Sequence, residues 1–139
     1  DSELVFGSVG TVSILSRGGV HRQIFHKLMY NRTFRKRFKE RVYLNCYNNG
    51  PLTPESVMRT WNELYSRINL ALYTESARWG DYRRDVHPYV ENTDQLYTPD
   101  NQFAAEYSRL MEEYFPHRTA KLIKQLRLLG IFCKRSYSK

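Results

Sequence analysis

The chain has 139 residues, 41% of them hydrophobic and 14% aromatic, which excludes disorder throughout and predicts one folded domain with a real core. Its net charge is +8. Its most apolar stretch, Ile68 to Tyr73, is too short for a membrane span, and Asp1-Ser2-Glu3 has neither the basic start nor the apolar segment of a signal peptide. Two cysteines, Cys46 and Cys133, are too few for a disulfide scaffold.

Residues 1–20 contain four glycines around a short β-branched stretch, Thr11 to Leu15, and are predicted to form an extended or loop segment. From Val20 onward, apolar residues recur at helical spacing. A first short helix is marked by Ile24, Phe25, Leu28 and Met29.

A second helix is predicted after Asn31, a good N-cap residue. Its apolar stripe consists of Phe34, Phe38 and Val42. The sequence Asn48-Asn49-Gly50-Pro51 is expected to end it, because these residues tolerate left-handed backbone and the proline cannot continue a helix.

The third helix has the clearest start, since Thr53 is a capping residue and Pro54 suits the first helical position. The helix is predicted to run to about Trp79 and to stop at Gly80. Apolar residues of this helix recur at steps of four and three residues, so they lie along one stripe of it, which we expect to be buried. These residues are Val57, Trp61, Leu64, Ile68 and Ala71.

Residues 81–97 lack periodicity and predict a long loop. Thr98-Pro99-Asp100 repeats the start signal and predicts a fourth helix, with Phe103, Tyr107, Leu110 and Tyr114 facing inward. Pro116 is expected to open a fifth, with Leu122, Ile123, Leu126 and Leu129 inward. Gly130 should end it in a Schellman cap that returns Ile131 to Leu126. The predicted fold is mainly α, a bundle of about five helices behind a short irregular or extended N-terminal segment.

Five segments share an order and spacing with one known family. They are Asn31–Phe38, Leu52–Glu55, Glu75–Asp81, Phe115–Thr119 and Gln125–Gly130. In these segments the chain resembles the C-terminal part of the spore-coat-protein-H (CotH) kinase family, over nearly its entire length. The resemblance implies a helical C-terminal lobe, residues 21–139, behind residues 1–20 as the end of a truncated catalytic lobe. The missing N-terminal lobe of the parent protein is then the expected partner.

Family members transfer phosphoryl groups from ATP to protein hydroxyls, and many are bacterial surface or exported proteins. The segment from Asp1 to Gly7 resembles their acidic segment, in which two carboxylates with one spacer precede an aromatic residue and glycine. The resemblance implies that Asp1 and Glu3 bind Mg²⁺ or Mn²⁺ in the intact parent, because alternate strand residues share a face. Glu3 departs from the commoner Asp, and the strand expected before Asp1 is absent. A solvated N-terminus without metal is the alternative.

No glycine pattern in the chain matches a nucleotide-binding loop. We therefore expect no cofactor and no catalysis from these residues alone, and ATP with Mg²⁺ or Mn²⁺ is implied only for the parent. The catalytic residues stay unidentified, and so does the protein substrate. The four histidines and two cysteines lack the short spacings of zinc sites.

A basic cluster on the second predicted helix is the candidate site for anions. It consists of Arg32, Arg35, Lys36, Arg37, Lys39 and Arg41, with Arg35, Lys36, Arg37 and Lys39 at its centre. It is either the solvated side of an amphipathic helix or the surface of a non-enzymatic binding module for an anionic partner. No nucleic-acid-binding motif accompanies it, so we do not expect a nucleic-acid partner.

The sequence Arg78-Trp79-Gly80-Asp81 closes the third predicted helix. It either orients a loop near a substrate cleft or is structural. In the structural interpretation Trp79 packs the helix end, Gly80 is the cap, and Asp81 pairs with one of Arg78, Arg83 and Arg84.

Overall fold

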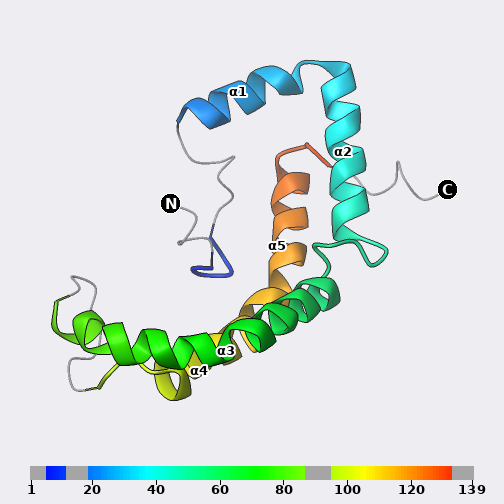
Figure 1. The fold of residues 1–139 in the computed structure, drawn as a ribbon. Coiled ribbons are helices and arrows are strands. Elements are labelled where there is room, and N and C mark those ends of the chain that lie inside the picture. Colours follow the sequence, from blue (N-terminus) through cyan, green and yellow to red (C-terminus); the bar gives the residue numbers. More distant parts are fainter. Residues whose placement is uncertain (1–5, 12–18, 87–94, 133–139) are drawn as a thin grey trace. The chain divides into compact units, whose positions relative to one another are not determined.

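The computed structural model describes residues 6–11, 19–86 and 95–132, apart from the side chain of Arg83, and these residues form a mainly α fold without strands (Figure 1). Within them lie four helices. The first three are α1 (Val20–Met29), α2 (Arg32–Cys46) and α3 (Pro54–Asp85), and the fourth is a continuous run of η3 (Pro99–Phe103), α4 (Ala104–Arg109), η4 (Leu110–Tyr114) and α5 (Phe115–Leu128). The predicted Asp1, Glu3 and β-branched stretch from Val12 lie outside the described residues.

The separation predicted between the fourth and fifth helices is wrong, because the chain passes from η4 directly into α5. Pro116 occupies the first turn of α5, as predicted. The residues just before it form a π-helical segment, η4, whose wider turn accommodates a proline ring that would clash in a regular helix. Within the described part of the chain, none of the helices combines the length and hydrophobicity that a membrane crossing requires.

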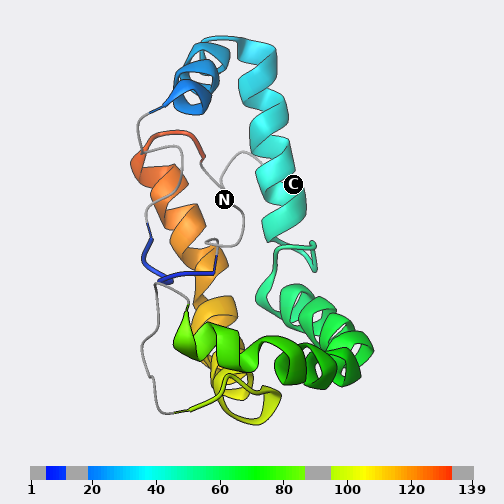
Figure 2. The same ribbon diagram turned by 60° about the vertical axis from the view of Figure 1, so that its left-hand side comes forward.

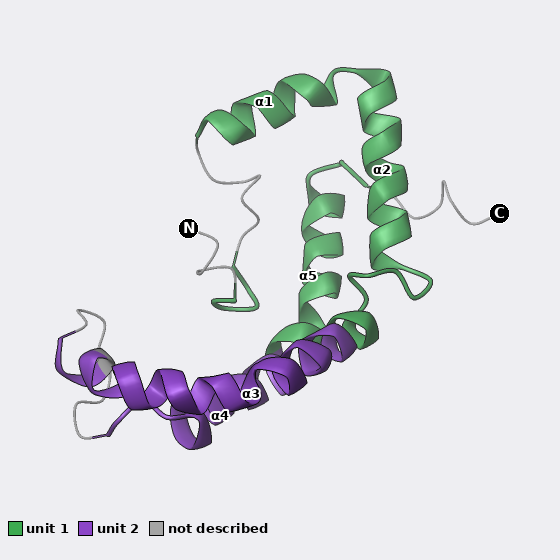
Figure 3. Cartoon of the chain, in the orientation of Figure 1, with its two compact units in different colours: residues 1–57, 114–139 green, residues 58–113 purple. Residues whose placement is uncertain are grey.

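The chain forms two compact units, residues 1–57 with 114–139 (unit 1) and residues 58–113 (unit 2) (Figure 3). In unit 1, α5 runs antiparallel beside α2 (Figures 1 and 2). Their facing sides enclose a core to which the chain after α5 also contributes. The buried members are Val42, Cys46, Ile123, Leu126, Ile131 and Phe132. Phe25 and Met29 of α1 pack against this core, and Phe25 meets Phe38 edge-on at 5.2 Å between ring centres.

Local signals in the sequence place the ends of α2 correctly. The Asn31 side chain accepts a hydrogen bond from the Phe34 backbone N–H at 3.0 Å, which confirms the predicted cap. Asn48 and Asn49 have φ of 51° and 60°, which confirms the left-handed ending. Gly50 is buried, and a Cβ there would lie 2.3 Å from the Leu44 carbonyl oxygen, so only glycine fits.

The end of α5 is the predicted Schellman cap. Gly130 has φ 68°, its N–H donates to the Arg127 carbonyl at 2.9 Å, and the Ile131 N–H donates to Leu126 at 2.9 Å. Ile131 joins Leu126 in the core, as expected. Leu129, predicted to face inward, is 47% exposed instead.

In unit 2 the middle of α3 packs antiparallel to η3 and α4. Tyr65 lies 5.6 Å from Phe103 and 4.9 Å from Tyr107, measured between ring centres. The Tyr107 hydroxyl donates to the Asn62 side chain, and the Tyr73 hydroxyl donates to Asp100 at 2.7 Å. This bond raises the pKa of Tyr73.

The stripe predicted to be buried on α3 is right only at its start, where Val57 and Trp61 are half-buried, and wrong further along. Leu64 and Ile68 are 48% and 45% exposed, and Ala71 is exposed as well. Beyond Trp61 the half-buried positions of α3 are shifted around the helix, and they are Tyr65, Asn69, Leu72 and Ser76. Because tyrosine and serine hydroxyls can face a partner when they are hydrogen-bonded, hydrophobicity alone selected the wrong face.

The predicted stop at Gly80 is also wrong, since α3 continues through it to Asp85. Gly80 is buried, and the backbone of Tyr97 returns directly over it. A Cβ on Gly80 would lie 2.7 Å from the Tyr97 carbonyl oxygen. The glycine is therefore a close-approach position within a helix and not a cap.

Replacing Gly80 with alanine tests this role. In an open helix interior the change stabilises by about 0.5–1 kcal/mol. Here we expect the urea midpoint to fall, with a loss of about 1–3 kcal/mol from overpacking against backbone. Gly10→Ala is the control, because its Cβ would meet only Ser8 Oγ at 3.7 Å. A rise in stability for Gly80→Ala would contradict the close approach.

Burial raises the pKa of the Cys46 thiol, a free cysteine in the core of unit 1. In a Cys133→Ser variant, reaction of Cys46 with iodoacetamide at pH 8 should be at least about tenfold slower in the folded chain than in guanidinium. Two effects act in the same direction: the higher pKa reduces the thiolate fraction, and packing excludes the reagent. Equal rates in both solvents would show that the α2–α5 core opens freely.

Candidate functional site

The candidate site is the place where the N-terminal segment is held on α5, within unit 1. The described segment, Phe6 to Thr11, follows the predicted metal ligands Asp1 and Glu3, which are themselves outside the described residues. Phe6 meets two aromatic rings at the start of α5 edge-on, Tyr114 at 5.8 Å and Phe115 at 5.9 Å between ring centres. Edge-to-face pairs at this separation are favourable beyond their buried area.

Two polar side chains of α5 bind the end of the same segment. The Arg118 guanidinium donates to the carbonyl oxygens of Val9 at 3.2 Å and Thr11 at 3.0 Å. Gln125 Nε2 donates to the Thr11 carbonyl at 3.3 Å. Arg118 and Gln125 are seven residues apart, about two helical turns, so they share one side of α5.

These contacts satisfy backbone carbonyls of a segment that has no helical partners of its own. Arg118 is partly buried, and both bonds come from its Nη1, which carries two N–H groups and can serve two acceptors. Hydrogen bonds from a charged donor contribute about 1.5–3 kcal/mol each when the acceptor is removed from water. Elsewhere in unit 1, the Thr119 hydroxyl donates to the Leu52 carbonyl, which joins α5 to the segment before α3.

The sequence did not predict these contacts between residues 6–11 and Phe115, Arg118 and Gln125, which we call the anchor. Phe115, Arg118 and Gln125 were noticed only as parts of the two segments that resemble the CotH family, without a role. A signal was available in retrospect, because Arg118 and Gln125 are polar residues on the inward half of an amphipathic helix. Such residues need buried partners, and carbonyls of a loop can supply them.

The Arg78–Asp81 sequence lies on α3 in unit 2. The contacts of its residues differ from those that the structural interpretation predicts. Trp79 is 49% exposed and meets Tyr82 edge-on, with the Arg78 guanidinium carbon 4.9 Å from its ring centre. It therefore does not bury the helix end. Asp81 accepts a hydrogen bond from the Tyr82 N–H at 2.7 Å.

The ion pair at the end of α3 is formed by Arg84 and Asp85. The hydrogen bond from Arg84 lowers the pKa of Asp85, and the same bond raises the pKa of Arg84. Of the three arginines predicted as partners of Asp81, Arg83 has a side chain outside the described residues, Arg78 lies over Trp79, and Arg84 pairs with Asp85.

This part of α3 holds the backbone at Tyr97, where the chain returns to the helix. The Ser76 hydroxyl donates to the Tyr97 carbonyl, and the Tyr97 N–H donates to the Gly80 carbonyl at 3.5 Å. Thr98 then starts η3, with its N–H donating to the Asn101 side chain at 2.9 Å. The predicted helix start at Thr98-Pro99 is confirmed.

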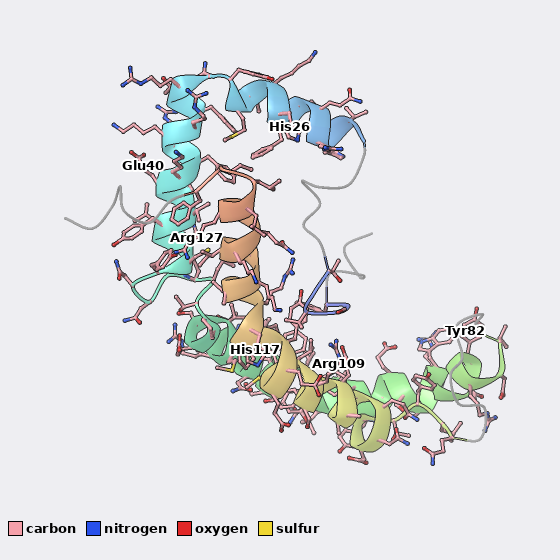
Figure 4. All side chains as sticks on the ribbon, turned by 180° about the vertical axis from the view of Figure 1, so that it is seen from behind. His26, Glu40, Tyr82, Arg109, His117 and Arg127 are labelled. Carbon is pink, nitrogen blue, oxygen red and sulfur yellow. The ribbon has the colours of Figure 1, made fainter. Side chains whose placement is uncertain are left out.

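The basic side of α2 carries the anion-binding candidates, and side chains with nitrogen tips project from it (Figure 4). Arg35 donates to the Met29 carbonyl at 2.9 Å, so it helps to cap α1. Lys36 lies 4.0 Å from Glu40 one turn later. Arg37 is exposed and Lys39 half-buried. Arg32 and Arg41 are exposed as well.

Charge is divided unevenly between the two units. Unit 1 contains 16 basic and four acidic residues, hence +12, and unit 2 contains six basic and ten acidic residues, hence −4. The net charge of +8 therefore conceals two units of opposite sign. Whole-chain composition alone could not predict this division.

Among the described residues, no three His, Cys, Asp or Glu side chains cluster closely enough to hold a metal ion. His26 accepts a hydrogen bond from Arg22 on the surface of α1, and His117 lies on α5 (Figure 4). No family model, no curated protein and no solved structure matches the chain.

Proposed function

We propose that the chain is the helical C-terminal part of a CotH-like atypical protein kinase. In this proposal α5 supports the segment that carries the metal ligands of an ATP-dependent phosphoryl-transfer site. The observation that carries the proposal is the anchoring of Phe6 to Thr11 by three residues of the resembling segments. Phe115 and Arg118 belong to one of these segments and Gln125 to the other.

The physical argument is one of positioning. A metal-binding carboxylate contributes to phosphoryl transfer only when it is held close to the position that the phosphates require. In the intact parent, this proposal has the anchor at Phe6 and Thr11 position Asp1 and Glu3, because they precede Phe6 by only three to five residues. Phe6-Gly7 is the pair that resembles the family pattern, and Phe6 is the residue that contacts the start of α5.

The chain alone is not proposed to be catalytic. ATP, Mg²⁺ or Mn²⁺ and the N-terminal lobe belong to the parent enzyme in this proposal. The role of the described helices is structural: the α2–α5 core makes α5 rigid, and α5 presents Arg118 and Gln125 to the segment.

Replacing Arg118 with alanine tests the proposal. Hydrogen exchange should become faster at the amides of residues 6–11, because two carbonyl acceptors lose their donor. In a protein with a CotH-family N-terminal lobe fused ahead of Asp1, phosphoryl transfer from ATP to a protein acceptor should fall about 10- to 100-fold. The measurements are exchange by mass spectrometry and transfer of labelled phosphate.

Lys121→Ala is the matched control, because Lys121 is an exposed basic residue on the same helix. It should change neither exchange nor transfer, whereas Asp1→Asn with Glu3→Gln should abolish transfer and leave exchange at residues 6–11 unchanged. If the fused protein transfers no phosphate while exchange shows residues 6–11 anchored, the kinase relationship is refuted and the anchor stands.

A second candidate function is a non-enzymatic binding module that uses the basic side of α2 for an anionic partner. The observation that favours it is the +12 charge of unit 1 together with the exposure of Arg32, Arg37 and Arg41. These three arginines are exposed, whereas the exposed Lys36 lies next to Glu40 and Arg35 has a structural bond to α1.

Changing Arg32, Arg37 and Arg41 to glutamine should lower the salt concentration that elutes the chain from heparin. With fewer basic side chains bound to heparin, fewer counterions are released on binding, and the binding is weaker. The control carries three glutamines in place of the exposed Lys27, Lys121 and Lys124, which removes the same charge from unit 1. Equal shifts for both triple variants would show a response to net charge and no specific surface.

A further inference from the structure

Unit 2 contains a cavity of about 350 Å³ between the second half of α3 and residues 97–103. Three of its walls are aromatic, Trp79 from α3, Tyr97 from the returning chain and Phe103 from η3. Among the described residues that line it, Glu75 is the only charged one. A combination of aromatic side chains and one carboxylate is the chemistry that attracts an organic cation.

Two of the polar side chains in the lining already have partners inside the protein. The Ser76 hydroxyl donates to the Tyr97 carbonyl. Gln102 accepts a hydrogen bond from the Thr98 N–H at 3.1 Å. Glu75 is thus the side chain in this cavity that is best suited to recognise a ligand.

The indole of Trp79 already attracts a cation within the chain. The Arg78 guanidinium carbon lies 4.9 Å from its ring centre, inside the range of a cation–π contact. Arg78 does not line the cavity, whereas Trp79 does. A ring that is 49% exposed and borders the cavity can therefore contribute to binding a second cation there.

The unit that contains the cavity is acidic overall, although Arg78 lies on its Trp79 wall. Unit 2 has a net charge of −4. A neighbouring cavity of about 240 Å³ shares Ser76, Thr98 and Pro99 with the first and is lined by Asp100. Asp100 thus adds a second carboxylate close to the shared residues, and the field of such carboxylates attracts positive ligands.

We propose that the cavity binds an arginine or lysine side chain of a basic peptide. The hydrocarbon stem would lie on the apolar walls and the cationic head would reach Glu75, which matches how these amphipathic side chains are buried. An uncharged apolar ligand would make no charge-assisted contact with Glu75, which is exposed at the cavity. This site is independent of the kinase relationship proposed above.

The test uses the full chain and two pentapeptides, Gly-Ala-Arg-Ala-Gly and its counterpart with citrulline, which keeps the shape of arginine and lacks its charge. Binding is followed at low salt by NMR through the backbone amides of residues 97–103. The arginine peptide should shift these signals saturably. The citrulline peptide should bind about tenfold more weakly, the size expected from losing one charge-assisted contact.

Glu75→Gln should lower the affinity for the arginine peptide by a similar factor. Glu63→Gln removes an exposed carboxylate from the same helix and unit, and it should leave this affinity unchanged. Trp79→Leu is a second, independent variant and should also weaken binding. Equal affinity for arginine and citrulline, or equal losses for the two glutamine variants, would overturn the proposal. Shifts confined to residues outside the cavity would overturn it as well.

Discussion

The packing of α2 against α5 is the constraint on which unit 1 depends. Among the described residues, α2, α5 and the two residues after Gly130 supply the buried side chains of this small core, and α1 packs against it, so each buried side chain matters; Leu126 is just 2% exposed. The Schellman cap returns Ile131 to that core and thereby fixes where α5 ends. Between α5 and the end of α2, the Arg127 side chain, labelled in Figure 4, donates to the Tyr47 hydroxyl at 3.4 Å. A helix held at its end and along its face is a rigid base for a loop.

Because α5 is held in this way, the hydrogen bonds from Arg118 can fix residues 6–11 in one place on unit 1. A segment of six residues without helical hydrogen bonds keeps one conformation only when its carbonyls have partners and its side chains have something to pack on. Arg118 supplies the first and the Tyr114–Phe115 pair supplies the second. The contacts lie at both ends of the segment, Phe6 and Thr11, so its backbone is restrained over its whole described length.

The sequence predicted where helices begin and end better than which sides they bury. Caps are local chemistry, so Asn31, Thr98 and Gly130 were interpreted correctly from a few neighbouring residues. The face of α3 could not be predicted in the same way, because Tyr65 packs through a ring contact with α4 that no local rule contains. The anchor of α5 was missed for the same reason: Arg118 and Thr11 are far apart in sequence, and only folding brings them together.

Gly80 shows how one residue type can have two physical meanings. A glycine near the end of an amphipathic pattern is typical of a helix cap, yet here its φ is not left-handed and α3 continues past it. The decisive fact is the Tyr97 backbone above it, which needs the space that a Cβ would fill. Ser76, one turn earlier, binds the same carbonyl. The two residues together fix the returning chain against α3. The position of Tyr97 on one wall of the cavity, with Trp79 on another, follows from that single close approach.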